Sequence, residues 1–263
     1  MRRSPMITLL TDFGARDWFV GTMKGVIAGI APRAVVVDLS HEVAPGDIRA
    51  GAFALAASYS FFPRGTIHLV VVDPGVGSKR KGIAVQTEQF CFVGPDNGVL
   101  SWALRREKIK SIHSLENSKF FLKPPSHTFH GRDVFAPVAA HLSHGTPIQR
   151  FGPRMSEPVH LPWPPPRRTR MGLEGEVIYV DRFGNALTNI ESGELESGGG
   201  RGWSVLAGRC LCPVESFYQA VPAGRPVAVI GSSGFLEIAV NGGSAAESFK
   251  LRPGTPVRLK RKG

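Results

Sequence analysis

An apolar run that leads straight into a charged, glycine-containing segment constrains the fold of this chain most strongly. Residues 67–72 form the run, and Asp73-Pro74-Gly75-Val76-Gly77-Ser78-Lys79-Arg80 follows it directly. An apolar run bounded by turn residues predicts a buried strand of a parallel sheet, and ligands bind at the carboxyl ends of such strands. Asp73 and Arg80 are therefore candidate site residues, although a plain Asp-Pro-Gly turn explains the same residues equally well.

Strands and helices alternate through the first half of the chain. Asp17 and Asp47 open two helical patterns, and Asp47 is placed to cap its helix. Asp133 is placed to cap a last helix that reaches Leu142 and carries Pro137 in its first turns. The expected strands are 7–11, 34–39, 67–72, 83–86 and 90–93. This alternation predicts an α/β fold, with a doubly wound, Rossmann-like N-terminal domain over residues 1–160.

The character of the sequence changes after Gly145. Residues 147–170 are rich in proline and basic side chains, so we expect no sheet pairing there and an extended linker over residues 161–170. Short strand patterns and frequent glycines follow, which predicts a smaller all-β barrel domain over residues 171–263. Its expected strands are 174–180, 202–206, 226–230, 235–240 and 255–260, and the Gly198-Gly199-Gly200 run is expected to be a loop.

Composition argues against several classes of protein. The chain has 263 residues, a 42% hydrophobic content and a net charge of +11, but its basic clusters are scattered and lack interleaved aromatic residues. We therefore expect a solvated basic surface and no nucleic-acid partner. Three cysteines and the absence of metal-ligand spacing predict neither a disulfide framework nor a metal site. No signal peptide or membrane helix is expected, which favours a cytoplasmic protein without a membrane partner.

A second polar segment, Thr11-Asp12-Phe13-Gly14, follows the first expected strand. A carboxylate in that place is suited to accept two hydrogen bonds from a vicinal diol such as ribose, and the glycine lets the backbone approach a ligand. Neither a Gly-x-Gly-x-x-Gly fingerprint nor a P-loop follows. The pattern therefore favours a nucleoside whose phosphate, if any, is not tightly held.

Three more segments carry polar groups at expected element ends. His130 lies just before a helix among small and polar residues, which favours an accessible imidazole, but a lone loop histidine is more often structural and His127 competes with it. Residues 181–185 combine a carboxylate, an aromatic ring and an amide, which would suit an ammonium and an adenine. Residues 231–235 offer hydroxyls and N–H groups for a carboxylate. Glycine-containing turns explain the last two segments equally well.

Taken together, in their order and spacing, these segments resemble the S-adenosylmethionine hydroxide adenosyltransferase family, also called the S-adenosylmethionine hydrolases, which is related to bacterial fluorinase and chlorinase. The resemblance runs from Ile7-Thr8-Leu9-Leu10-Thr11-Asp12-Phe13-Gly14 to Gly231-Ser232-Ser233-Gly234-Phe235-Leu236. It implies release of adenosine and L-methionine from S-adenosylmethionine by water, with no cofactor and no metal. It also implies a homotrimer whose sites lie between the N-terminal domain of one subunit and the C-terminal domain of its neighbour.

The resemblance further implies roles for individual residues. A set like the family's water-activating triad falls on Asp73, Arg80 and His130, and the ribose-binding aspartate corresponds to Asp12. The implied substrate-binding groups of the C-terminal domain are Asp181 at the methionine end, Phe183 and Asn185 as the ligand-facing aromatic and amide, and Ser232 near the methionine carboxylate.

Departures from the related halogenases favour the hydrolase branch. Those enzymes carry a tyrosine, a serine and a tryptophan around the halide, where this chain has His130, Gly131 and Gly46, and Asp73 replaces another halogenase tyrosine. A carboxylate repels a halide but orients water. Two alternatives stay open, a halogenase that forms 5′-halo-5′-deoxyadenosine and a nucleoside-binding protein without turnover. Whether Asp73 or His130 takes the proton of the water is also open.

Overall fold

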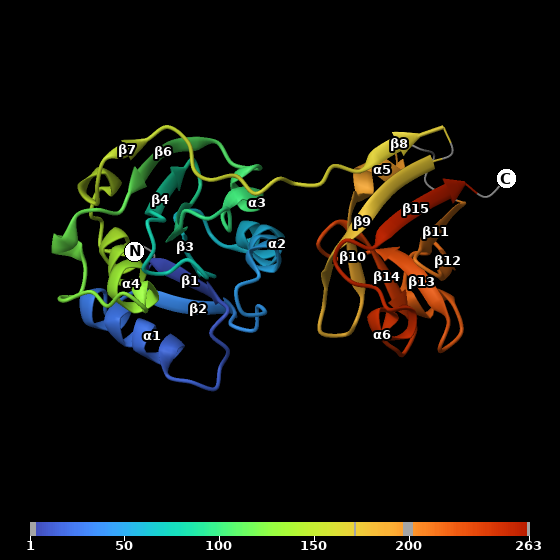
Figure 1. The fold of residues 1–263 in the computed structure, drawn as a ribbon, viewed down its shortest axis with the longest axis horizontal. Coiled ribbons are helices and arrows are strands. Elements are labelled where there is room, and N and C mark those ends of the chain that lie inside the picture. Colours follow the sequence, from blue (N-terminus) through green and yellow to red (C-terminus); the bar gives the residue numbers. More distant parts are fainter. Residues whose placement is uncertain (1–3, 171, 197–201, 262–263) are drawn as a thin grey trace. The chain divides into compact units, whose positions relative to one another are not determined.

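The structure, a computed structural model, describes residues 4–170, 172–196 and 202–261. It divides the chain into two compact units, the first ending at Pro162 and the second beginning at Trp163 (Figure 1). Each unit has its own sheet and its own hydrophobic core. The loop predicted at Gly198–Gly200 lies outside the described residues.

A mixed sheet of seven described strands forms the frame of the first unit, in the spatial order β2-β1-β3-β5-β4-β6-β7. Strands β2, β1, β3 and β5 are parallel, whereas β4, β6 and β7 pair antiparallel with their neighbours. The bounds are β1 Met6–Thr11, β2 Val35–Ser40, β3 Ile67–Val71, β4 Gly82–Thr87, β5 Cys91–Pro95, β6 Ile109–Ser114 and β7 Arg154–Met155. The predicted α/β class is confirmed.

Helices cover both faces of this sheet because its central strands are apolar on both sides (Figure 1). Successive strand side chains point to opposite faces. Ile7 and Leu9 of β1 pack in one core with α1 and α4, whereas Leu10 packs in another core with α2 and α3. The helices are α1 Phe19–Ile30, α2 Ile48–Ser58, α3 Ser101–Leu104 and α4 Ala136–Ser143, with short helical turns at Tyr59–Phe61, Ser118–Phe120, Gly131–Phe135 and Ile148–Arg150.

The predicted helix starts are partly confirmed. Asp47 caps α2, since its Oδ1 accepts a hydrogen bond from the Ala50 N–H at 2.9 Å. The predicted cap at Asp133 is wrong. A π-helical turn over Gly131–Phe135 already precedes α4, so Asp133 lies within helical structure, and its carboxylate accepts a hydrogen bond from the Ser126 N–H at 2.7 Å instead.

The strand order places a topological switch point at β1. From β1 the chain crosses to β2 on one side, and β3 lies on the other side of β1, with Thr11 in register with Val71. In open α/β sheets the crevice outside the carboxyl ends of strands at such a point is the usual ligand site. Asp12 and Asp73 follow these two strands and therefore both lie at this edge of the sheet.

An antiparallel, nearly closed β-barrel forms the second unit. The described strands follow the order β12-β11-β15-β9-β10-β14-β13, and β8 pairs with β9. A parallel bridge between Val214 and Ala228 connects the two ends of this order. The bounds are β8 Arg167–Thr169, β9 Gly172–Val180, β10 Ala186–Glu191, β11 Trp203–Ala207, β12 Cys210–Pro213, β13 Pro226–Ile230, β14 Phe235–Val240 and β15 Pro256–Arg261, with helical turns at Ser192–Glu196, Tyr218–Ala220 and Ala245–Phe249.

The proline-rich region is more structured than expected. The prediction that residues 147–170 do not pair into a sheet is wrong at both ends of that region, because β7 pairs with β6 and β8 pairs with β9. The prolines are concentrated at 162–166, just before β8, so Arg167–Thr169 keep the N–H groups that a strand needs.

The described residues include all three cysteines, and their helices are short. Cys91, Cys210 and Cys212 are free thiols, the last two buried in the barrel core. None of the described helices has the length and apolar character needed to cross a bilayer.

His68 of β3 is a buried histidine in an aromatic surround. Its Nδ1 lies 2.8 Å from the hydroxyl of Thr8, and rings of Tyr59, Phe90 and Phe92 lie 5.2–5.9 Å from its ring. Burial lowers the pKa of His68 from 6.5 to about 3. The imidazole is thus a neutral part of the core.

The free energy of unfolding should therefore depend on pH through His68. The folded-state pKa is lowered, so the unfolded chain binds the proton more readily, and stability falls as pH drops below 6.5 toward about 3. The slope for this one group is about 1.4 kcal/mol per pH unit. Urea titrations at several pH values should show that His68→Gln removes this component, whereas His160→Gln, at an exposed histidine, keeps it. Parallel profiles for wild type and His68→Gln would contradict the assignment.

Candidate active site

The segment after β3 places a guanidinium against a carboxylate. Arg80 Nε donates to Asp73 Oδ1 at 2.9 Å and Oδ2 at 3.0 Å, and its Nη2 also donates to Oδ2. The Asp73 side chain is only 4% exposed and that of Arg80 12%. The Arg80 guanidinium also lies over the Phe135 ring, 5.3 Å from its centroid. Such a desolvated, multiply bonded pair fixes the orientation of both side chains.

His130 joins this pair from a distant part of the sequence. Its Nδ1 lies 2.8 Å from Arg80 Nη2, so one guanidinium bridges the carboxylate and the imidazole. We call Asp73, Arg80 and His130 the polar triad. His130 directly precedes the π-helical turn Gly131–Phe135, a rare element that is frequent at functional sites.

A close approach of two backbones makes this meeting possible. Consecutive turns, with hydrogen bonds from Val76 N–H to Asp73 O and from Ser78 N–H to Gly75 O, reverse the chain between Asp73 and Arg80. Gly77 has a φ of +76°, and a Cβ there would lie 2.4 Å from the carbonyl oxygen of His127. A glycine is therefore required for this segment to pack against the one that carries His130.

Burial and the bond to Arg80 together determine the protonation of His130. Burial first, and the positive charge of Arg80 second, lower the pKa of His130 below 6.5. A guanidinium can only donate, so His130 Nδ1 must accept. The neutral ring then carries its proton on Nε2, which makes Nε2–H a hydrogen-bond donor.

Asp12 lies at the same sheet edge with a free carboxylate oxygen. Its Oδ2 accepts a hydrogen bond from the Gly46 N–H at 2.8 Å, and among the described residues no partner occupies Oδ1. Figure 1 shows that the strands β1 and β3, which precede Asp12 and Asp73, lie side by side in the centre of the first unit.

The other predicted site residues lie in the second unit. Three of them, Asp181, Phe183 and Asn185, lie in the turn between β9 and β10. Asp181 Oδ1 accepts hydrogen bonds from the N–H groups of Phe183 and Asn185, at 2.9 and 2.8 Å, and Oδ2 accepts one from Asn185 Nδ2 at 3.0 Å. Gly184 has a φ of +80°, and a Cβ there would lie 2.0 Å from Ser244 Oγ. The turn is thus tightly constrained, and Asp181 Oδ2 keeps a lone pair for a ligand.

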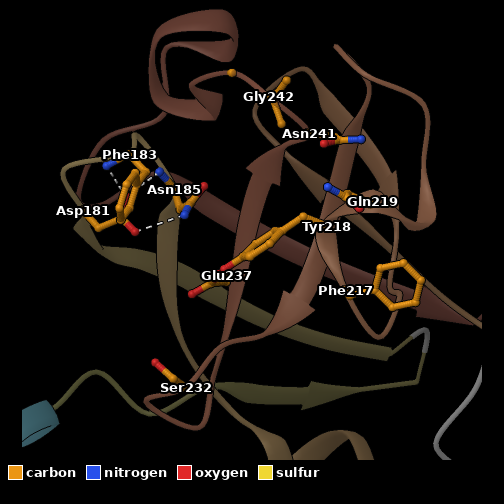
Figure 2. A pocket seen from close by; sticks show the side chains of 12 residues that line it. Asp181, Phe183, Asn185, Phe217, Tyr218, Gln219, Ser232, Glu237, Asn241 and Gly242 are labelled. Carbon is orange, nitrogen blue, oxygen red and sulfur yellow. Dashed lines mark hydrogen bonds between the residues drawn. The ribbon is translucent and has the colours of Figure 1, made fainter.

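Asp181, Phe183 and Asn185 line a cavity of about 910 Å³ in the second unit (Figure 2). Asp181 and Asn185 lie on one side and Ser232 on another, between β13 and β14. Three exposed aromatic side chains, those of Phe183, Phe217 and Tyr218, also line it. A cavity with aromatic walls and a few convergent polar groups is the usual form of a small-molecule site.

The sequence did not lead us to four polar residues of this cavity, Tyr218, Gln219, Glu237 and Asn241. The Tyr218 hydroxyl donates to Glu237 Oε1, and the two side chains meet in Figure 2. Burial raises the pKa of Glu237 and raises that of Tyr218 to about 12. Glu237 was detectable in principle, because it is a lone carboxylate inside the apolar strand β14, Phe235–Val240.

The eight predicted site residues therefore form two groups. Asp12, Asp73, Arg80 and His130 lie at the carboxyl edge of the first sheet, and Asp181, Phe183, Asn185 and Ser232 lie around the cavity of the second unit. Among the described residues, no group of three or more His, Cys, Asp or Glu side chains could hold a metal ion. The carboxylate acceptors and aromatic rings present suit an organic ligand with diol, ammonium and ring groups.

The fold and these two groups define a two-domain small-molecule protein, with an α/β unit that can polarise a small nucleophile and a barrel unit with an aromatic-lined cavity. The model of the SAM hydroxide adenosyltransferase N-terminal domain matches residues 7–152, and that of the SAM hydroxide adenosyltransferase C-terminal domain matches residues 175–258. The chain belongs to this family, as the resemblance implied.

Individual relatives agree with the family. An (R)-S-adenosyl-L-methionine hydrolase from Thermus thermophilus is 41% identical over 264 residues, covering 96% of this chain and 98% of the relative. A fluorinase from Actinopolyspora mzabensis is 27% identical over 291 residues, covering 98% and 97%. The crystal structure of an uncharacterized conserved protein from Thermotoga maritima superposes with a TM-score of 0.92 at 39% identity, covering 97% of this chain and 100% of that one. The similarity thus spans both units.

The protonation of His130 is directly measurable. Imidazole resonances in NMR spectra should titrate below pH 6.5 for His130, and Arg80→Ala should raise that pKa because it removes the neighbouring positive charge. Lys79→Ala is the matched control, since it removes an exposed positive charge one residue away. A wild-type His130 that titrates at or above pH 6.5 would contradict the lowered pKa.

Proposed function

We propose that this protein hydrolyses (R)-S-adenosyl-L-methionine to adenosine and L-methionine, the activity named for its Thermus thermophilus relative. The observation that carries this proposal is the polar triad at the switch point of the first sheet, where Arg80 joins Asp73 to His130. Asp12 at the same edge supplies a carboxylate oxygen for the ribose diol. Apart from water, this reaction requires no second substrate and no cofactor.

The chemistry makes modest demands on the protein. Water attacks the ribose C5′, the C5′–S bond breaks, and its electron pair turns the sulfonium into the neutral thioether of methionine. Because the leaving group is neutral, no general acid is needed, and the released proton must come from the attacking water. General-base assistance and in-line placement of that water are therefore the main catalytic terms.

The hydrogen bonds of the triad indicate which residue orients the water and which accepts its proton. His130 Nδ1 is occupied by Arg80, and Nε2 carries a proton, so His130 acts as a donor that orients the water oxygen. Asp73 is an acceptor-only group when ionised and takes the proton. Arg80 fixes both partners and stabilises negative charge as it develops on the oxygen. Asp73 is thus our proposed base, which the sequence left open.

The cavity of the second unit suits the cationic end of the substrate. Asp181 carries a negative charge and an unused lone pair on Oδ2, which favours the methionine ammonium. Phe183 and Asn185 offer a ring face and an amide to the adenine, and Ser232 offers a hydroxyl to the carboxylate. A nucleoside-binding protein without turnover would use the same groups, so turnover must be measured.

The halogenase alternative is disfavoured by space as well as by charge. Where the halogenases carry a serine, a Cβ on Gly131 would lie 3.2 Å from Met23 Sδ and 3.3 Å from Phe13 Cε2. A serine there would press on packed neighbours. The carboxylate of Asp73, where the halogenases have another tyrosine, also repels a halide.

The assembly and the location remain parts of the proposal. We infer a homotrimer in which each substrate lies between the first unit of one subunit and the second unit of its neighbour, as the resemblance implies. A heterologous contact of this kind closes into a ring. Free thiols at all three cysteines are consistent with a cytoplasmic protein.

Substitutions in the triad should separate catalysis from folding. Asp73→Ala and His130→Ala should each lower adenosine release by at least about 100-fold, because they remove the base or the water-orienting donor. Asp12→Ala should mainly raise KM. Chromatography of adenosine and methionine after incubation with each sulfonium epimer measures all three, with Lys79→Ala as the control. Near-wild-type turnover in either triad variant would refute the assignment, and halide-dependent 5′-halo-5′-deoxyadenosine would support the halogenase instead.

Complementation tests the intersubunit site. Asp73→Ala inactivates the first-unit half and Asp181→Ala impairs the second-unit half of a site. Co-assembled from equal amounts, the two variants should regain about a quarter of wild-type turnover, since one site in four then combines two intact halves. Light scattering gives the oligomeric state of each sample. Mixed assemblies that stay inactive would indicate sites built within single subunits.

A further inference from the structure

A histidine outside the polar triad contacts the segment that carries Asp12. His41 Nδ1 lies 2.9 Å from Thr11 Oγ1, and Thr11 is fully buried at the end of β1. On the other side of the ring, His41 Nε2 lies 3.1 Å from Asp38 Oδ1, and Lys24 Nζ lies 2.6 Å from Asp38 Oδ2. Contacts thus run from an exposed lysine through Asp38 and His41 to a buried hydroxyl.

The partners of His41 determine which atom donates and which accepts in each contact. The carboxylate of Asp38 can only accept, so it favours a proton on His41 Nε2, although the N–H does not point along the line to the oxygen. Nδ1 then accepts from the Thr11 hydroxyl. Thr11 Oγ1 in turn accepts from the Phe13 N–H at 3.2 Å. The histidine therefore determines how the hydroxyl next to Asp12 is oriented.

The backbone of His41 reinforces this connection. The Gly14 N–H donates to the His41 carbonyl oxygen at 2.7 Å, and the Gly46 N–H donates to Asp12 Oδ2 at 2.8 Å. The segment after β2 thus contacts the Thr11–Gly14 loop before, at and after Asp12.

We propose that His41 is a positioning residue for the Asp12 carboxylate, acting through the Thr11 hydroxyl. The proposal rests on the proposed role of Asp12 as the ligand of the ribose diol. An aspartate–histidine–hydroxyl order is also found in nucleophilic triads, but Thr11 is fully buried, so its hydroxyl is not open to a substrate. The contact between His41 and Thr11 can therefore orient the adjacent loop that carries Asp12.

A pair of near-isosteric substitutions separates the two ends of the ring. His41→Gln places its amide near the Nε2 position and loses the bond to Thr11, whereas His41→Asn keeps an acceptor near the Nδ1 position. His41→Gln should raise KM, and the Kd of adenosine in calorimetry, by about 5- to 10-fold, the value of one hydrogen bond. His41→Asn should stay within about twofold of wild type, and kcat should change little in both. His160→Gln, at an exposed histidine, is the control.

A double-mutant cycle tests the route through the hydroxyl. Thr11→Val removes the hydroxyl with little change in shape and should match His41→Gln. The double variant should bind adenosine no more weakly than either single variant, because both remove the same contact. Additive losses, or unchanged KM and Kd in His41→Gln and Thr11→Val, would overturn the proposal. A lower Tm with unchanged Kd would likewise show a purely structural role.

The readouts distinguish this inference from the proposed function. If the wild-type protein binds adenosine but releases none from either epimer of the substrate, the proposed hydrolysis fails, and the adenosine Kd values still test His41. If the wild type is active and His41→Gln binds adenosine normally, only the positioning role fails.

Discussion

The candidate site of the first unit depends on one guanidinium. Arg80 donates to both oxygens of Asp73 and to Nδ1 of His130, so a single planar group fixes two side chains that lie 57 residues apart in the sequence. A lysine could not replace it, because a point charge on a flexible stem lacks the fork of donors that holds two acceptors at set angles. The tautomer of His130, on which the proposed division of roles in the triad rests, follows from this geometry.

Topology explains why the first group of site residues meets at all. Asp12, Asp73 and the segment after β2 all lie beyond the carboxyl ends of β1, β2 and β3, where parallel strands deliver their connecting loops to one edge. The loops are then joined by short-range bonds such as Gly46 N–H to Asp12 and Gly14 N–H to His41 O. The carboxylates are placed by the rigid sheet and oriented by these bonds.

How much could be predicted from the sequence depended on whether a feature was local. Strand β3 was predictable because both its faces are apolar. The proximity of Asp73 and Arg80 was predictable because they lie seven residues apart and a turn joins them. Strand β10 was missed because its buried positions include Thr188 and Asn189, whose polar groups bond to Leu236 O and Pro164 O. The residues alone suggested a ribose ligand for Asp12 and ligand groups in the barrel, but plain turns explained the barrel segments equally well. The family resemblance supplied the individual roles of His130 and of the barrel residues, since no local pattern tells a turn from a binding site.

Both groups of site residues have charges that suit a cationic substrate. The protein carries a net charge of +11, which opposes the approach of a sulfonium with an ammonium group. In the triad, Asp73 neutralises Arg80, and the lowered pKa of His130 keeps its ring uncharged, so the cluster has no net charge where we propose that the reacting carbon binds. A protonated His130 would add a positive charge there and remove the acceptor that Arg80 needs. In the barrel, Asp181 places a carboxylate on the cavity wall, and burial, together with the nearby Asp181 charge, raises the pKa of Glu237. In the proposed reaction, the positive charge of the substrate is thus met by the Asp181 carboxylate at its amino-acid end and by a triad without net charge at C5′.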